Sequence, residues 1–306
     1  YEISACLVGS EMCIRDRSLS SGKLVQVKNQ MLILNDGRTY YFNSNGDKVT
    51  KGGWYHINYD NMVFVTGGGS HYVKERIYKA SGIFRKYSFN DSKKSWDMNK
   101  NLWKNTGRKL MYFDGSGTCT ILYDQASNIL YRYISSSKSY KRVSNVIDKL
   151  NGSRYYFYDA NGNRRTSSGW KKVNGSTAYY VCDGGYVTSR YTDQKGTKKV
   201  YDFDYSKNTW VQKKNMWKTV YRSRYYFGSK GVATMSYNNS TKKAYKFTGR
   251  KWKPAKKLIM KIGNANYYFN SAAKRVVKAG KYKTADGYIA YVNRRGVVYK
   301  LSLIHI

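Results

Sequence analysis

The chain has 306 residues and combines a high tyrosine content with a strong positive charge. It contains 33 Tyr, 10 Phe and 7 Trp, a single proline, and a formal net charge of +38. No run of roughly 18 apolar residues occurs, which excludes a transmembrane helix, and the 4 cysteines are too few for a disulfide framework. The charge indicates attraction to polyanions in general, and it identifies no particular partner.

The two ends of the chain differ from its interior. Residues 1–17 (ending CLVGSEMCIRDR) and 302–306 (SLIHI) share no periodicity, turn pattern or tyrosine content with the rest, and both resemble translated sequencing-adapter DNA. We expect these segments to be extraneous and exclude them from the fold prediction. Their removal takes away two basic and three acidic residues, leaving 54 Lys and Arg against 15 Asp and Glu, a net charge near +39. Of the cysteines, Cys119 and Cys182 remain.

One phrase of sequence occurs three times in the interior. A Tyr-Tyr-Phe triplet is followed by an Asn-Gly pair, a basic stretch and a Gly-Trp pair, and the two full copies span residues 40–54 and 155–170. The third copy begins at Tyr267 and has Gly280-Lys281 in place of Gly-Trp. Asn-Gly tolerates the positive φ angles of a two-residue hairpin turn. Each full copy therefore predicts an aromatic strand paired with the basic strand that follows it.

The same landmarks recur at a longer period of about 115 residues, which indicates a repeat architecture. The spacings are 115 for Tyr40 and Tyr155, 116 for Trp54 and Trp170, and 114 for both Trp96 and Trp210 and Trp103 and Trp217. We predict two long repeats, residues 18–142 and 143–253, and a partial third repeat, residues 254–301. Pro254 is expected near the joint between the second and the third.

Shorter hairpins are predicted inside each long repeat. They span Arg38–Thr50, Gly53–Thr66, Arg108–Tyr123, Trp170–Cys182, Lys199–Val211 and Lys281–Val292. No window of the sequence has helical periodicity longer than two turns. Residues 143–150 come nearest to it, but their sequence is equally compatible with a strand or a loop. Because one such hairpin is only marginally stable, the fold is predicted to be all-β, an elongated solenoid of stacked β-hairpin repeats. Side-chain alternation places Tyr155 and Phe157 in a dry spine and Tyr156 on the opposite face.

The Tyr-Tyr-Phe-Asn-Ser-Asn-Gly phrase followed by Gly-Trp resembles a known family of repeats. It is similar to the cell-wall-binding (choline-binding-like) and glucan-binding repeats of Gram-positive surface proteins, and to the repeat regions of large clostridial toxins. The match is best at residues 40–66, 155–182 and 267–292. The resemblance implies shallow aromatic sites between hairpins where choline or sugar rings dock. It also implies a monomeric module of a larger secreted protein, located outside the cell at the bacterial wall.

The resemblance also implies which residues bind the ligand. Trp54 and Trp170 match the tryptophan of the Gly-Trp pair, Tyr41 and Tyr156 match the tyrosine of the preceding strand, and Lys281 replaces the tryptophan of the third copy. The further candidates for carbohydrate or choline binding are Tyr180, Trp96, Trp103, Trp210 and Trp217. The usual Trp-Tyr-Tyr string of the next hairpin is absent, so glucan or another wall glycan fits as well as choline.

The residue types point to glycan binding without catalysis. Trp and Tyr faces stack on sugars while their polar edges and nearby Asn reach hydroxyl groups, and the basic charge attracts teichoic acids and other anionic wall polymers. A glycosidase needs two carboxylates at a set separation, but Glu75 is the only glutamate of the interior. His56 and His71 lack the spacing of a metal pair. We therefore expect no catalytic residue, no cofactor and no metal.

Two alternatives stay open. The chain could be a basic protein that binds nucleic acid or another polyanion by charge alone, although it contains no nucleic-acid-binding motif and no specific nucleic acid is expected. Charge-only binding would collapse between about 50 and 200 mM salt, whereas stacking on neutral glucan would persist. The chain could also be the C-terminal binding region of a wall hydrolase, such as an amidase, or of a glucosyltransferase whose catalytic domain lies outside this sequence.

Overall fold

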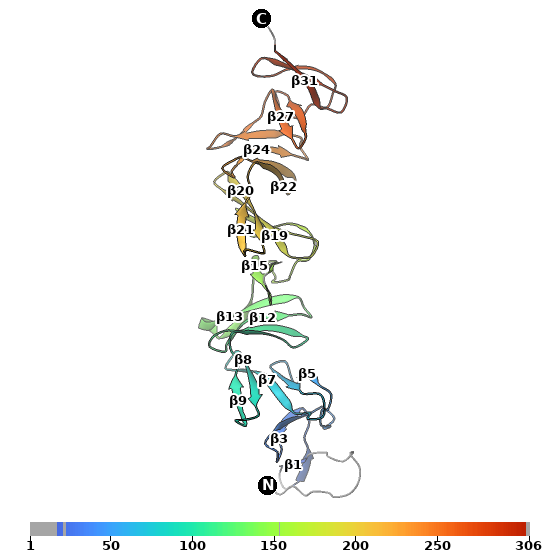
Figure 1. Cartoon of the computed structure of the whole chain (residues 1–306), viewed down its shortest axis with the longest axis vertical. Helices are drawn as coiled ribbons and strands as arrows, with labels where there is room; N and C mark the ends of the chain where they lie inside the picture. The colour runs from blue at the N-terminus through green and yellow to red at the C-terminus, as the bar shows by residue number, and fades with distance from the viewer. Residues whose placement is uncertain (1–16, 21–22, 153, 304–306) are drawn as a thin grey trace. The chain divides into compact units, whose positions relative to one another are not determined.

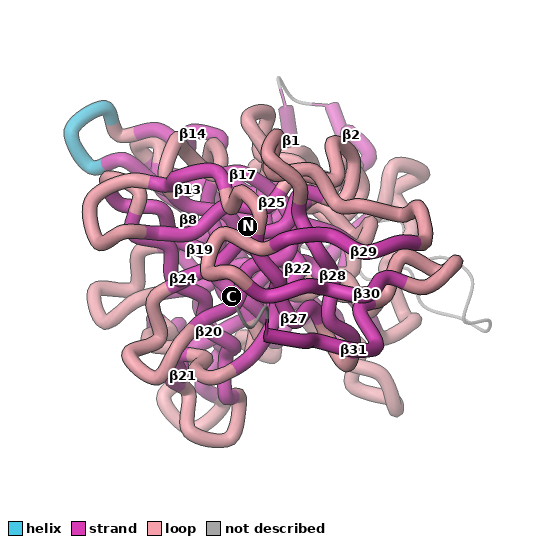
Figure 2. The backbone as a smooth tube through the Cα atoms, turned by 90° about the horizontal axis from the view of Figure 1, so that it is seen from above, coloured by secondary structure: helices cyan, strands magenta, loops and turns pink. Residues whose placement is uncertain are grey.

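The protein is described here by a computed structural model that covers residues 17–20, 23–152 and 154–303. The chain divides into two compact units, Tyr1–Val143 and Ser144–Ile306. Both units consist of antiparallel strands, and the described residues contain a single short 3-10 helix, η1 (Ser135–Ser137), seen in cyan in Figure 2. The prediction of an all-β chain is confirmed.

The first unit contains two two-stranded sheets followed by two five-stranded sheets (Figure 1). The two-stranded sheets are formed by β1 (Arg17–Ser20) with β2 (Lys23–Gln26) and by β3 (Gln30–Ile33) with β4 (Thr39–Phe42). The first five-stranded sheet contains β5 (Gly53–His56), β6 (Asn61–Val65), β7 (Val73–Ala80), β8 (Ile83–Asn90) and β9 (Ser95–Met98). The second contains β10 (Leu102–Asn105), β11 (Lys109–Phe113), β12 (Cys119–Asp124), β13 (Ile129–Ile134) and β14 (Ser139–Arg142).

The second unit repeats the order of one two-stranded and two five-stranded sheets, and then begins again with a two-stranded sheet. A two-stranded sheet of β15 (Val146–Lys149) and β16 (Tyr155–Tyr158) comes first. Two five-stranded sheets follow: β17 (Gly169–Lys172), β18 (Thr177–Val181), β19 (Val187–Gln194), β20 (Thr197–Asp204) and β21 (Thr209–Gln212), then β22 (Met216–Val220), β23 (Ser223–Phe227), β24 (Ala233–Asn238), β25 (Ala244–Phe247) and β26 (Trp252–Pro254). The chain continues as the pair β27 (Leu258–Ile262) and β28 (Ala265–Phe269), and a three-stranded sheet of β29 (Gly280–Lys283), β30 (Tyr288–Val292) and β31 (Val298–Leu303).

Most of the predicted short hairpins are present. Gly53 pairs with Val65, Phe203 pairs with Trp210, and the strands of the Arg108–Tyr123 hairpin pair as β11 and β12. The hairpins that start at Trp170 and Lys281 are formed by β17 with β18 and by β29 with β30. These hairpins belong to larger sheets, so each five-stranded sheet, and not the single hairpin, is the structural unit. Residues 146–149, for which strand and loop were equally compatible, form the strand β15.

The predicted pairing of the aromatic triplets was wrong. β4, β16 and β28 each pair with the strand that precedes them, and the basic segment after the Asn-Gly turn adds only a single bridge, such as Tyr158 with Arg164. The predicted Arg38–Thr50 hairpin is likewise reduced to one bridge, between Phe42 and Lys48. The aromatic triplets are therefore edge strands of two-stranded sheets.

The turn after each triplet explains this difference. Gly162 N donates to Asp159 O at 3.0 Å, and Gly162 has φ +77°, so glycine occupies the left-handed position after the turn. Asp159 Oδ1 accepts hydrogen bonds from the backbone N of Asn161 and Asn163, both at 2.9 Å. The side chain thus fixes a wider turn than the predicted two-residue one. The same two-bond pattern surrounds Asn43, Asp114, Asn270 and Asn293.

Neighbouring sheets stack through buried apolar side chains within each unit. In the first unit, Met62 and Phe84 of the β5–β9 sheet cluster with Met111 and Phe113 of the β10–β14 sheet, and all four are at most 1% exposed. In the second unit the corresponding layer joins the β17–β21 and β22–β26 sheets and contains Val200, Phe227 and Ala233. Because each sheet buries a face against its neighbour, the core is a series of thin layers and not one central mass.

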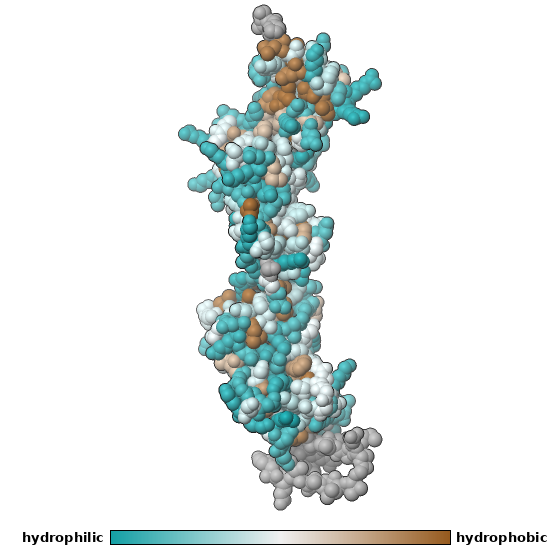
Figure 3. Space-filling view, viewed as in Figure 1, coloured by the Kyte–Doolittle hydropathy of each residue, from teal (hydrophilic) through white to brown (hydrophobic). Residues whose placement is uncertain are grey.

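The predicted extraneous ends lie mostly outside the described residues. Residues 1–16 and 304–306 fall outside that part, whereas Arg17 is the first residue of β1 and Ser302 and Leu303 are the last two of β31. The exposed apolar side chains of β31 are Tyr299, Leu301 and Leu303. Figure 3 shows a brown, hydrophobic area over the C-terminal sheet, whereas much of the rest of the visible face is hydrophilic.

Candidate functional site

An aromatic groove in the second unit is the best-formed candidate site. It has a volume of about 600 Å³ and is lined by Gly169, Trp170, Tyr180, Thr188, Ser189, Lys218, Thr219 and Tyr221. The lining comes from β17, β18 and β19 of one five-stranded sheet, and from β22 and the turn after it in the next. We call this the Trp170 groove.

Three tyrosines surround the indole of Trp170. Tyr180 lies directly opposite it on β18, with ring centroids 5.5 Å apart and planes at 65°. Tyr191 meets it edge-on at 6.2 Å, and Tyr221 is tilted towards it at 6.3 Å. Tyr191 is 8% exposed and belongs to the core, whereas Tyr221 is 49% exposed. The groove therefore has a buried aromatic base and an exposed aromatic rim.

The indole of Trp170 is held in place by the neighbouring sheet. Its Nε1 donates a hydrogen bond to Thr219 O at 2.9 Å, and the ring packs on the clusters that contain Ala178, Val200 and Val220. A fixed ring loses little conformational entropy when a ligand stacks on it. Because the N–H is already used, Trp170 can offer a ligand its ring face but not its donor.

Polar groups border the aromatic surface. Lys218 Nζ is 3.1 Å from Asp202 Oδ1, and Ser189 Oγ donates to the same oxygen at 2.6 Å. Burial raises the pKa of Asp202, but the Ser189 hydrogen bond and the charge of Lys218 outweigh it, so the net shift is downward. An ionised Asp202 thus positions Lys218 beside the rings, where its ammonium group can meet sugar hydroxyl groups.

Tyr221 was not predicted as a site residue. It follows β22 with φ +53°, a left-handed conformation that is unfavourable for a bulky side chain. It also lines a second opening, of about 530 Å³, that includes Trp170, Phe157, Asp159 and Lys171. Strained backbone conformations of this kind cluster at binding sites. In the sequence Tyr221 belongs to no aromatic phrase, so only its structural position reveals it.

In the first unit, Trp54 has different surroundings. It pairs across the sheet with Phe64, at 5.7 Å between ring centroids. Lys104 Nζ lies over both rings, 5.3 Å from the Trp54 centroid and 5.7 Å from the Phe64 centroid. Lys104 is held there by Glu75, at 2.7 Å. The face of Trp54 is thus partly covered by a residue of the same chain.

The remaining tryptophan candidates form cross-strand aromatic pairs. Trp103 lies opposite Tyr112 at 5.2 Å, and Trp217 lies opposite Tyr226 at 5.6 Å. Such pairs stabilise a sheet by about 0.5–1.5 kcal/mol beyond the area they bury. Trp96 and Trp210 pair in the same way with Phe89 and Phe203, at 5.3 and 4.9 Å. All four are half-buried, so they contribute to the sheets as well as to the surface.

Tyr41 and Tyr156 are less available than the resemblance implies. Tyr41 is 4% exposed and packs on Tyr55 at 5.8 Å. The Tyr156 ring is covered by Arg164, whose guanidinium carbon is 3.9 Å from the ring centroid. In the third copy, Lys281 Nζ lies 5.5 Å from the Tyr291 centroid, beside an opening of about 490 Å³. None of these positions presents an open aromatic face like that of Trp170.

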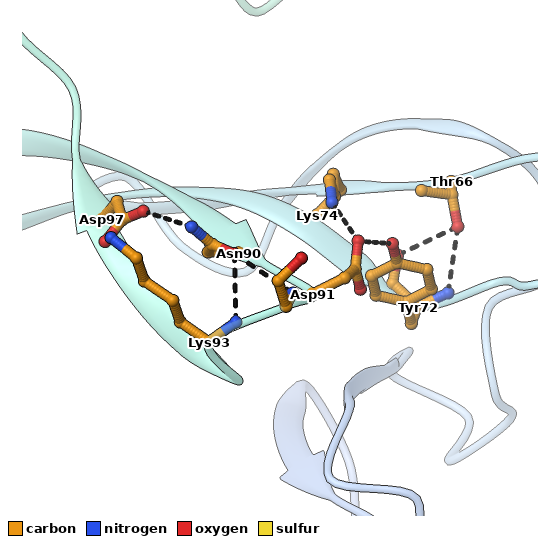
Figure 4. A network of polar contacts seen from close by, with 8 residues as sticks. Thr66, Tyr72, Lys74, Asn90, Asp91, Lys93 and Asp97 are labelled. Carbon is orange, nitrogen blue, oxygen red and sulfur yellow. Dashed lines mark hydrogen bonds and ion pairs between the residues drawn. The ribbon is translucent and has the colours of Figure 1, made fainter.

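The carboxylates near Trp96 serve the sheet. Tyr72 Oη donates to Asp91 Oδ2 at 2.9 Å, Lys74 forms an ion pair with the same oxygen, and Asn90 Nδ2 donates to Asp97 at 2.9 Å (Figure 4). The contacts with Lys74 and Tyr72 lower the pKa of Asp91. These two carboxylates order the turn between β8 and β9, and their contacts do not place them as a catalytic pair.

Other kinds of site were searched for in the described residues. No group of three or more His, Cys, Asp or Glu there is arranged to hold a metal ion, and Cys119 and Cys182 are both free thiols. Within the same residues, no helix is long and apolar enough to cross a membrane.

Comparisons with known proteins find one similar protein by sequence and several similar solved structures, and no family model matches the chain. The chain is 26% identical over 232 residues to Glucosyltransferase-I of Streptococcus downei, an alignment that covers 63% of this chain and 13% of that protein. Among solved structures this chain is similar to alternansucrase in complex with isomaltononaose (15% identity, TM-score 0.26, covering 91% of this chain and 17% of that one). It is also similar to choline binding protein F of Streptococcus pneumoniae (17% identity, TM-score 0.26, covering 93% and 98%).

Proposed function

We propose that this chain is a non-catalytic carbohydrate-binding module that attaches a larger protein to glycan at the bacterial cell surface. The observation that carries this proposal is the Trp170 groove, where an exposed ring, Tyr221, and a fixed indole stand beside Lys218. Apolar sugar faces stack on such rings, while hydroxyl groups take hydrogen bonds from lysine and threonine. A neutral glucan is the ligand that this combination fits best.

The likeness to Glucosyltransferase-I supports the choice of a glucan. It spans 13% of that protein's length, so the glucosyl-transfer activity of the whole protein is not carried over to this chain. We infer that the aligned part has a binding role and that catalysis, if the parent protein performs any, resides elsewhere.

The positive charge adds a second, weaker interaction. At +38 the chain is attracted to anionic wall polymers such as teichoic acids, an attraction that decays over about 8 Å at physiological salt. We propose that this attraction raises the rate of encounter with an extracellular wall surface and that aromatic stacking provides the specificity.

We further propose that the sheets continue as one elongated solenoid of monomeric repeats, with repeats at residues 18–142, 143–253 and 254–301. Two features support this. Adjacent sheets within each unit share apolar clusters, and the order of one two-stranded and two five-stranded sheets occurs in both units. Small-angle scattering of the whole chain tests this arrangement, because a solenoid and a compact pair of units differ strongly in radius of gyration.

Retention on glycan tests the proposed function. The whole chain is mixed with insoluble α-glucan and, separately, with purified bacterial walls, and the bound fraction is compared with that of a Trp54→Ala/Trp170→Ala variant. We expect retention of the unaltered chain to exceed that of the variant on at least one support. Equal retention would contradict the proposal.

The salt dependence of the same assay distinguishes glycan binding from the alternative function, binding by charge alone. Binding to nucleic acid or another polyanion by charge alone is favoured by one observation, the net charge, and it would be lost between about 50 and 200 mM salt. Binding to neutral glucan by stacking should be nearly constant over that range. Loss of all binding at the higher salt would favour the polyanion alternative.

A further inference from the structure

Two aromatic clusters on the five-stranded sheets enclose arginine side chains of the chain itself. In the first unit, the guanidinium carbon of Arg76 is 4.4 Å from the ring centroid of Trp96, 5.3 Å from that of Tyr87 and 5.4 Å from that of Tyr78. Tyr78 and Tyr87 are themselves stacked, at 5.4 Å and 10°. A cation within about 6 Å of several ring faces is in the geometry of a cation–π cage.

The second unit contains a similar arrangement 114 residues later, with two rings in place of three because Thr192 stands where the first unit has Tyr78. The guanidinium carbon of Arg190 is 4.6 Å from the Tyr201 centroid and 5.0 Å from the Trp210 centroid. In both units the arginine lies directly opposite the tyrosine on the neighbouring strand, Arg76 with Tyr87 and Arg190 with Tyr201. The register of the sheet therefore places the cation over the ring in each copy. We call the two sets of rings the Trp96 cage and the Trp210 cage.

Ion pairs do not compete with the rings for either arginine in the described residues, although Arg190 also interacts with the hydroxyl group of Tyr179. No carboxylate within 4.0 Å pairs with Arg76 or Arg190 there, and the buried Nε of each donates to no protein acceptor. Burial lowers the pKa of Arg76, but a guanidinium stays charged at neutral pH. Aromatic side chains, through their ring faces and, at Tyr179, a hydroxyl group, are thus the main electrostatic partners of these two cations.

The same device recurs on the edge strands. Lys48 lies 4.1 Å from the Tyr40 centroid, Arg164 lies 3.9 Å from that of Tyr156, and Arg275 lies 4.0 Å from that of Tyr267. The three tyrosines each lie two residues before the residue that bridges to the basic segment, so the pairs are equivalent in strand register, although Tyr156 is the second residue of its triplet and the other two are the first. Covering an aromatic face with a cation of the same chain is therefore a recurrent feature of this protein. In contrast, no described cation lies over Trp170, Tyr180 or Tyr221.

We propose that Arg76 and Arg190 are built-in occupants of the Trp96 and Trp210 cages and exclude cationic head groups of the choline class from them. A quaternary ammonium ion is recognised by the same ring faces that these guanidinium groups cover. A tethered side chain competes at a high effective concentration, and a cation that entered beside it would meet like charge. This inference deepens the proposed function. It rests on that function only in the claim that the ligand is a neutral glycan and not choline.

The test follows the indole N–H signal of Trp210 by NMR while choline chloride is added to the whole chain. In the unaltered protein we expect no saturable shift of that signal. In Arg190→Ala we expect a saturable shift, with an apparent Kd for choline at least about tenfold lower than in the unaltered protein. The reason is that the cage without its arginine is open to choline in most molecules. Arg224→Ala is the matched control. It removes a charge 5.8 Å from the ring centroid of Trp217 and should leave the Trp210 signal unresponsive.

Two results would overturn the proposal. One is a Trp210 shift that saturates with choline equally well in the unaltered protein. The other is a folded Arg190→Ala variant that still does not respond. If the variant fails to fold, the arginine Nε–H signals of the unaltered protein are measured instead. Ring-current shifts of two of these signals would support the placement of Arg76 and Arg190 in the cages, and the absence of such shifts would refute it. Loss of glucan retention alone, with the choline results as expected, would count against the proposed function and not against the cages.

Discussion

Trp54 and Trp170 occupy equivalent positions in two five-stranded sheets, and their surroundings differ. Each follows a glycine at the start of the first strand and lies opposite an aromatic residue on the second, Phe64 or Tyr180. Around Trp170 stand Tyr191 and Tyr221, whereas the residues 114 positions earlier are Ile77 and Gly107. The two copies thus have the same strand pairing at this position. The additional tyrosine side chains of the second copy form the aromatic groove.

The ion pairs beside the two tryptophans differ in a related way. In the first copy the cross-strand pair is Glu75 with Ser88, and in the second it is Ser189 with Asp202. The carboxylate has therefore moved to the neighbouring strand. Lys104 reaches Glu75 across the face of Trp54, while Lys218 reaches Asp202 and leaves the face of Trp170 without a cation above it. The position of the carboxylate thus determines whether the lysine side chain lies over the indole ring.

Removing Trp170 should have the largest effect. Loss of a central tryptophan typically weakens binding by about 2 kcal/mol, so Trp170→Ala should raise the Kd for soluble α-glucan roughly 30-fold in calorimetric titrations. Trp54→Ala is the control, since it removes an indole at the same place in the equivalent sheet, and it should change the Kd less than about fivefold. Equal losses in the two variants would refute the distinction between the copies.

Replacing Tyr221 by the residue of the first copy should have a smaller effect. Tyr221→Gly removes one ring, which should raise the Kd about fivefold. The free energy of unfolding should change by less than about 1 kcal/mol. Glycine removes the strain of the left-handed backbone, and this gain offsets the lost ring contacts and the larger conformational entropy of the unfolded chain. Tyr221→Asn keeps a residue that tolerates this backbone and should weaken binding equally. Unchanged binding in both variants would remove Tyr221 from the site.

Acidification should produce the smallest effect. The pKa of Asp202 is lowered in the folded protein below its ordinary value of 3.8. Its contribution to stability is therefore present above the unfolded pKa and is lost as the pH falls through the folded value. The melting temperature of the unaltered chain should decrease more steeply below about pH 4 than that of Asp202→Asn. Identical slopes would mean that the ion pair with Lys218 does not stabilise the fold.

Much of the fold could be predicted from the sequence because strand and turn signals are local. The hairpins that begin at Gly53 and Trp170 are present close to their predicted bounds, since aromatic strand residues flank a short polar turn in each. The partner of the Tyr155–Tyr158 strand was mispredicted. An Asn-Gly pair does not reveal that the Asp159 side chain accepts two backbone hydrogen bonds and widens the turn.

The site could be predicted in part. Trp170 and Tyr180 follow from the repeated phrase, whereas Tyr221 stands alone after Val220 and replaces the glycine of the other copy. The arginine-filled cages were missed for a different reason. Arg76 and Trp96 are 20 residues apart and meet only because two intervening strand pairings bring them together, so no short sequence pattern marks the contact.

An NMR titration that observes both tryptophans in one sample tests the central claim most directly. The whole chain is titrated with a soluble α-glucan oligosaccharide at 200 mM salt, where charge alone contributes little, and the indole N–H signals of Trp170 and Trp54 are followed together. The groove predicts a saturable shift at Trp170 and little or none at Trp54. A shift at Trp54 with Trp170 unmoved, or no shift at either, would contradict it.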